Sequence, residues 1–159
     1  MIKTETMAYS APRPGLMGHL LAARALLERV PFSIVQLVCR LAIAGVFLRA
    51  GLQKVAGWET TLALFSEEYK LPLLPPEFAA TMATATEVGC SILLLFGLAT
   101  RVATLPFFGM ILTIQLFVFP HAWPEHLTWT AILLVLFTRG AGAVSIDRVI
   151  GHWLDRRRD

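Results

Sequence analysis

The sequence contains few residues of the kinds that usually carry enzymatic chemistry. Only two of its 159 residues are cysteines, Cys39 and Cys90, and they do not form a CxxC pair. Two such thiols exclude a disulfide scaffold, and we interpret both as small apolar filler. No nucleophile–base arrangement, glycine-rich phosphate loop or haem motif is recognisable. The sequence therefore leaves the catalytic residues unassigned.

Metal-ligand and nucleic-acid patterns are also missing. His121 and His126 are five residues apart around Pro124. That spacing is poor geometry for a helical metal site, so we expect no metal. The basic run Arg156–Arg158 is typical of an anchor attracted by anionic lipid, and we expect no nucleic-acid partner.

What the chain has instead is apolar sequence. Its hydrophobic content is 56% and its mean hydropathy is +0.65. Four apolar stretches cover residues 32–57, 78–100, 102–119 and 123–137. The first three are near the roughly 20 residues that cross about 30 Å of hydrocarbon, and the fourth is shorter. We predict an all-α fold, a four-helix transmembrane bundle in a lipid bilayer.

Two further helices are expected outside the spans. Residues 16–30 alternate leucines with Arg24 and Glu28, which indicates an amphipathic helix on the membrane surface or the start of the first span. Residues 58–77 interleave apolar and charged side chains before a proline-rich turn, which favours a short helix on the outer face. That outer loop either caps the bundle or forms a lid over a pocket.

The charge distribution predicts the orientation. Most lysines and arginines fall before the first span, at Arg101 or near the carboxyl end, whereas acids dominate the other side. We expect a bacterial-type plasma membrane, and the positive-inside rule places both termini on its cytoplasmic side. We expect no cleavable signal peptide. The predicted organisation is a cytoplasmic segment with an amphipathic helix (1–30), a membrane domain (31–147) and a basic tail (148–159).

Two opposite charges interrupt the apolar stretches at matching depth. Arg49 lies about 12 Å inside the end of the first span, and Glu87 lies about 13–14 Å inside the start of the second. Because an isolated charge in hydrocarbon is costly, we predict an Arg49–Glu87 pair, with Lys54 above it and Gln115 near enough to join. The pair either fixes helix register or lines a polar ligand pocket.

Other polar residues are weaker candidates. Glu68 and Tyr69 face a pocket or belong to a solvated acidic loop. Arg40 and Asp147 fall at similar depth near the inner face, and we predict that they pair and tie the tail to the first span. That role would be structural.

Several motifs, taken in order, resemble the DoxX family. They are RLAIAGVFLRAGLQKV (40–55), FSEEYKLPLLPPE (65–77), TEVG around Glu87, GLATR (97–101) and GAGAVSID (140–147). The resemblance covers about residues 34 to 148 and implies a four-helix membrane protein. The family is named after a relative of a thiosulfate:quinone oxidoreductase subunit, and some members are linked to membrane oxidoreductase complexes. Where the family usually has Gly-Pro-Gly, this chain has Gly140-Ala141-Gly142. Without the proline, the end of the helix before it is held less rigidly.

The resemblance leads to one functional hypothesis and two alternatives. The leading hypothesis is an accessory subunit of a quinone-linked membrane redox system, which binds partner proteins and carries no redox centre of its own. A bound quinone is then the one ligand expected, with no other cofactor. The alternatives are a small-solute permease or channel, which would need homo-oligomerisation, and a passive scaffold. Whether the chain is an enzyme stays open.

Overall fold

The computed structural model describes residues 15–157, and every regular element in that range is a helix. The chain forms two compact units that divide after Pro31. In the first unit, α1 runs over Leu16–Glu28, at the place predicted for an amphipathic helix, and Arg24 pairs with Glu28 at 2.8 Å. Parts of the predicted segments 1–30 and 148–159 lie outside the described residues.

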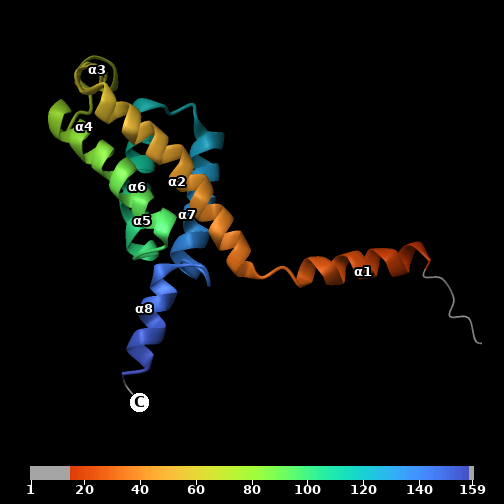
Figure 1. Cartoon of the computed structure of the whole chain (residues 1–159). Helices are drawn as coiled ribbons and strands as arrows, with labels where there is room; N and C mark the ends of the chain where they lie inside the picture. The colour runs from red at the N-terminus through yellow and green to blue at the C-terminus, as the bar shows by residue number, and fades with distance from the viewer. Residues whose placement is uncertain (1–14, 158–159) are drawn as a thin grey trace, which may run out of the picture. The chain divides into compact units, whose positions relative to one another are not determined.

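The second unit is a helical bundle (Figure 1). Three of its segments, η1, η2 and η3, are π-helical, and each directly continues the α-helix before it. The elements are α2 (Phe32–Ala56), α3 (Trp58–Ala63), η1 (Leu64–Tyr69), α4 (Pro76–Ala85), η2 (Thr86–Cys90), α5 (Ser91–Phe96), α6 (Thr100–Thr113), η3 (Ile114–Val118), α7 (Trp123–Arg139) and α8 (Ile146–Asp155).

Within residues 15–157, three continuous helices are long and apolar enough to cross a membrane. They are Phe32–Ala56, Pro76–Phe96 and Thr100–Val118. The fourth predicted span is α7, whose 17 residues extend about 25 Å, at the lower limit for a transmembrane helix. The all-helical architecture predicted from the sequence is confirmed.

The bundle is apolar inside and outside. α2 packs against α5, α7 and η2, while α6 packs against α7, η2 and α5. The core between them consists of Ile43, Ala44, Phe47, Leu94, Ala103, Phe107, Ile111, Leu133 and Leu136. Large apolar side chains such as Leu41, Val46 and Leu105 are nevertheless exposed. A helix that is hydrophobic all round is suited to lipid.

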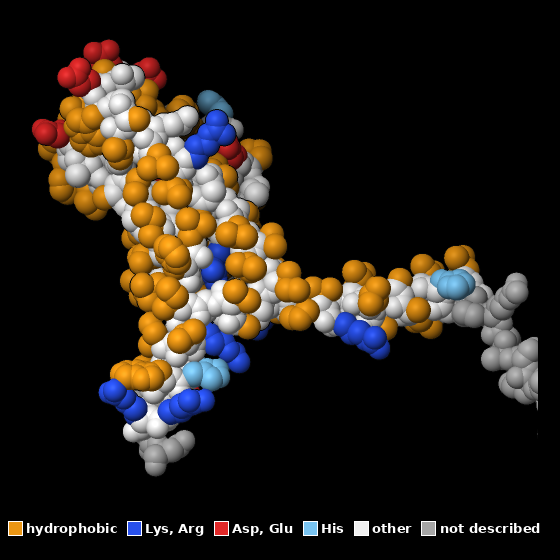
Figure 2. All heavy atoms as spheres, viewed as in Figure 1, with side chains coloured by type: hydrophobic (Ala, Val, Ile, Leu, Met, Phe, Trp, Pro, Cys, Tyr) orange, Lys and Arg blue, Asp and Glu red, His pale blue; other side chains and the backbone are white. Residues whose placement is uncertain are grey.

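The two ends of the bundle differ in charge. We call the end with α3 and η1 the loop end, and the end with α8 the tail end. The acidic side chains visible in Figure 2 gather at the loop end, whereas basic ones surround α8. α8 itself is strongly amphipathic, because Ile146, Val149, Ile150 and Trp153 recur at helical spacing and are all exposed.

Candidate functional site

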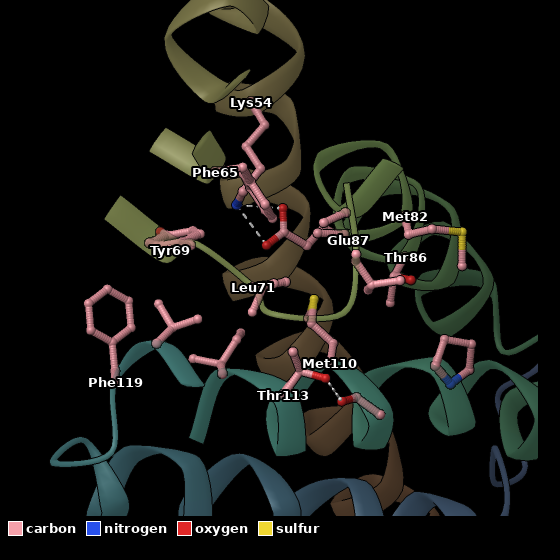
Figure 3. A pocket seen from close by; sticks show the side chains of 17 residues that line it. Lys54, Phe65, Tyr69, Leu71, Met82, Thr86, Glu87, Met110, Thr113 and Phe119 are labelled. Atoms are coloured by element: carbon pink, nitrogen blue, oxygen red, sulfur yellow. Dashed lines mark hydrogen bonds and ion pairs between the residues drawn. The ribbon is translucent and has the colours of Figure 1, made fainter. Parts of the chain in front are cut away.

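An ion pair joins α2 to η2 near the loop end. The ammonium Nζ of Lys54 donates to both carboxylate oxygens of Glu87, at 2.8 Å each (Figure 3). The side chain of Lys54 is 18% exposed and that of Glu87 is 6% exposed. Charges this poorly solvated depend on each other, because a lone charge in hydrocarbon would be costly.

The pair predicted from the sequence, Arg49–Glu87, is wrong. Gly51 faces η2 so closely that a Cβ atom there would lie 2.8 Å from the Cβ of Glu87. Lys54 is three residues further along and shares that face. Arg49 is two residues before Gly51, about 200° around the helix, and its side chain is exposed on another face. The depth estimate placed Arg49 and Glu87 at similar levels in the membrane, but it could not show that their side chains point to different faces.

Gly51 sets the distance between the helices that carry the pair. In Gly51→Ala, the new Cβ would lie 2.7 Å from Val88 Cγ2 and 3.1 Å from the Val88 backbone nitrogen. We expect a loss of about 1–3 kcal/mol, measured by thermal unfolding in detergent, because backbone must move. Gly45→Ala is the matched control, since nothing lies within 4 Å of its Cβ position. Equal melting of the two variants would contradict the close α2–η2 contact.

The ion pair forms part of the wall of a hollow of about 300 Å³. All three π-helical segments contribute to its lining, and π-bulges are frequent at functional sites. The remaining walls come from α4, α6, the loop between η1 and α4, and Phe119 directly after η3. The lining residues are Lys54, Phe65, Tyr69, Leu71, Leu74, Ala79, Met82, Ala83, Thr86, Glu87, Pro106, Gly109, Met110, Thr113, Ile114, Val118 and Phe119.

The hollow has a buried polar side and an exposed apolar side. Glu87 and Phe65 are each only 5% exposed, whereas Met82 and Phe119 are about half exposed. Because those exposed residues belong to the outward surface of an apolar bundle, the opening faces the region that lipid occupies. Figure 3 shows the two charged groups beside Phe65, with Phe119 across the hollow. A molecule entering from lipid would meet apolar contacts first and the charges last.

Tyr69 is the polar aromatic residue of this wall. Its ring packs edge-on against Phe65 at 4.9 Å and against Phe119 at 5.8 Å between centroids. Burial raises the pKa of Tyr69 above its ordinary value, and the charges of Glu68 and Glu87 add to the rise. The phenol therefore stays a neutral hydrogen-bond donor at physiological pH. Glu68 itself is exposed and lines a separate hollow.

The raised pKa of Tyr69 predicts an alkaline effect. Its contribution to folded stability is complete below the ordinary pKa near 10 and is lost as pH rises through the raised value. We expect the thermal midpoint of the parent to fall over this range more than that of Tyr69→Phe, which cannot ionise. Parallel melting curves across alkaline pH would show that the phenol is solvated.

Gln115 does not join the ion pair. Its Nε2 donates to the carbonyl of Pro120 at 2.8 Å, and its Oε1 lies 2.7 Å from His126 Nδ1. His126 is 4% exposed, so this contact satisfies a buried imidazole. The predicted participation of Gln115 in the charged cluster is wrong, because its side chain reaches toward α7 and not toward η2.

The predicted Arg40–Asp147 pair also fails to form. The Arg40 guanidinium donates to four backbone carbonyls instead, those of Leu94, Leu95, Ala141 and Val144, at 2.7–2.9 Å. Asp147 accepts from the amides of Ala99 and Thr100, at 2.6 and 3.0 Å. The last turn of a helix leaves carbonyls without partners, and the first turn leaves amides without partners. Arg40 donates to carbonyls, and Asp147 accepts from amides.

Three residues of the hollow, Lys54, Tyr69 and Glu87, were candidates from the sequence, and a polar ligand pocket was one of the two roles predicted for the charged cluster, but the apolar part of the lining was not predicted. Most of its lining, including Met110 and Thr113, carries no charge and reads as ordinary span sequence. The available signal was the row of α2 residues Phe47, Gly51 and Lys54, which share one face at three- and four-residue steps. In the range 15–157 no group of three metal-ligating side chains comes together.

These features define a small, all-helical integral membrane protein with a buried ion pair beside a lipid-facing hollow. The sequence profile of the DoxX family matches residues 35–120, which is more than half of the chain. The chain belongs to the DoxX family. The matched region includes the ion pair and every residue that lines the hollow, and it ends before α7. No curated protein and no solved structure matches the chain.

Proposed function

We propose that the hollow binds the ring of a membrane-soluble quinone, and that the chain serves as an accessory subunit of a quinone-linked redox system. The observation that carries this proposal is the ion pair at the inner end of a lipid-facing apolar hollow. A volume of about 300 Å³ is at the lower end of the range for small-molecule sites.

The chemistry of the wall suits a quinone in both oxidation states. A quinone carbonyl accepts hydrogen bonds, which the Lys54 ammonium and the Tyr69 hydroxyl can donate. A quinol hydroxyl donates, and the Glu87 carboxylate can accept. Phe65 and Phe119 offer aromatic faces for a ring. In this proposal the electrons come from a partner protein.

Blocking the hollow tests the binding. A Cβ at Gly109 would meet nothing within 4 Å, so Gly109→Leu places a side chain in the open space of the hollow. We expect the purified chain to bind a short-chain ubiquinone analogue, measured by quenching of tryptophan fluorescence, and Gly109→Leu to weaken that binding at least about tenfold. Gly45→Leu, whose site also has open space but lies outside the hollow, is the control.

Two results would contradict quinone binding in the hollow. If the parent and Gly109→Leu bind the analogue equally, the quinone does not occupy the hollow. If the parent retains no quinone after gentle extraction and binds none when it is added, the quinone link is wrong. Co-purification of a redox enzyme with the full chain is the separate test of the accessory role.

A second function is favoured by one observation, the position of Lys54 between two hollows. Besides the lipid-facing hollow, Lys54 lines one of about 490 Å³ at the loop end, together with Gln53, Glu67 and Glu68. A charged side chain that borders two hollows is a feature that a permease for a small solute or a proton would need. Solute or proton flux in proteoliposomes, lost in Glu87→Gln, would favour this alternative over quinone binding.

The location proposed for the chain is a bacterial-type plasma membrane, with both termini in the cytoplasm. It is supported by basic residues near the tail end and acidic residues near the loop end. Fusions at the carboxyl end test the orientation. Green fluorescent protein should be fluorescent there and alkaline phosphatase inactive, and the reverse pattern would contradict it.

A further inference from the structure

Three arginines converge on one hollow at the tail end. Arg101 of α6, Arg139 of α7 and Arg148 of α8 all line a space of about 480 Å³. The loop of residues 140–145, the start of α2 and the turn before α6 complete its walls. Segments that are far apart in the sequence thus bring three positive charges to one place.

Three positive charges face one acidic side chain in this hollow, so positive charge is in excess. In residues 15–157 the ion pairs are Arg24–Glu28 and Lys54–Glu87, and neither lies in this hollow. The one acid in the lining is Asp147, and both of its oxygens accept hydrogen bonds from backbone amides. The hollow is therefore a site of concentrated positive charge.

The existing contacts of two arginines leave most of their donors free. Arg101 makes one long hydrogen bond, 3.3 Å from Nη2 to the carbonyl of Thr138, and lies over Gly140. The guanidinium of Arg139 is 5.8 Å from the ring centroid of Phe32. A guanidinium has five N–H donors in a fork that matches phosphate.

The hollow also lies at the level where a bilayer changes from hydrocarbon to headgroup. Its residues come from the first turn of α2, the first turn of α6 and the last turn of α7, which are ends of membrane-crossing segments. Anionic headgroups occupy that level, and basic pockets between spanning helices are known to hold them.

We propose that this hollow binds the phosphate of an anionic phospholipid, held by Arg101, Arg139 and Arg148. The phosphate oxygens accept hydrogen bonds from the guanidinium forks, and the acyl chains lie along the apolar surface of the bundle. The site is separate from the quinone hollow at the loop end. Its ligand anchors the ends of α2, α6, α7 and α8 to one leaflet.

Lipid titration of the detergent-purified full chain, followed by native mass spectrometry, tests the proposal. We expect phosphatidylglycerol to bind at least about tenfold more tightly than phosphatidylcholine. In Arg101→Gln/Arg139→Gln, the affinity for phosphatidylglycerol should fall roughly ten- to thirtyfold while that for phosphatidylcholine stays unchanged. The control, Arg156→Gln/Arg157→Gln, removes two arginines outside the hollow and should lower the affinity by less than about threefold.

The outcomes separate the site from general attraction. An equal loss in the control would show diffuse attraction by the basic tail end and overturn the proposal. So would equal binding of the two lipids by the parent. Arg101→Lys/Arg139→Lys keeps the charge and should bind at intermediate strength, which shows that the hollow still folds; binding as weak as in the glutamine variant would contradict it. Displacement of the lipid by equimolar inorganic phosphate would assign the site to a free anion and reject the lipid.

Discussion

Glu87→Gln is expected to destabilise the bundle by about 3–5 kcal/mol. The substitution keeps the size of the side chain but removes its charge, so the Lys54 ammonium, 18% exposed, is left without a counter-ion beside an apolar hollow. Thermal unfolding in detergent, followed by circular dichroism, measures the loss. The effect should be among the largest of any single substitution in the chain.

A double-mutant cycle decides whether Lys54 is the partner. Lys54→Met/Glu87→Met should be much more stable than the sum of the two single losses, because replacing a buried ion pair by apolar residues is often nearly neutral. Arg49→Met/Glu87→Met is the matched comparison and should be additive within about 0.5 kcal/mol. Coupling through Arg49 and none through Lys54 would restore the pair predicted from the sequence and contradict the structure.

The membrane spans and the depth of the buried charges could be predicted from the sequence, but the partner of Glu87 could not. Hydropathy locates the membrane-crossing helices to within a few residues, because hydrocarbon thickness fixes their length. Helical rise placed Arg49 and Glu87 at matching depth, but it carries no information on the direction in which a side chain points. The direction depends on which face of α2 packs, and Gly51 marks that face by its close contact with η2.

The hollow depends on a property that the sequence does not display. Three π-helical segments widen the bundle around it, and their residues, such as Thr86 and Ile114, are compatible with an ordinary α-helix. Likewise, the acidic and aromatic loop around Tyr69 could be predicted as a short helix, but its contact with Phe119 joins residues fifty positions apart. Such contacts follow from packing and not from local pattern.

At the tail end, Arg40→Met is expected to cost about 3–5 kcal/mol, because it removes four hydrogen bonds at once. Arg40 is 2% exposed, so the four carbonyls would lose their partner where water is scarce. Two of them end α5 and two belong to the loop before α8, so that loop should also become sensitive to protease. Arg49→Met, an exposed arginine on the same helix, is the control and should change little.

Gly97 provides the test that links this loss to geometry. A Cβ there would lie 2.7 Å from Nη1 of Arg40, and φ is +65°, so Gly97→Ala should destabilise through both contact and backbone strain. In the Arg40→Met background the clash with the guanidinium disappears, whereas the backbone strain and the 2.6 Å approach to the Cβ of Ser145 remain. The cost of Gly97→Ala should therefore be smaller in that background than in the parent. Equal costs in both backgrounds would mean that the Arg40 guanidinium does not occupy the space next to Gly97.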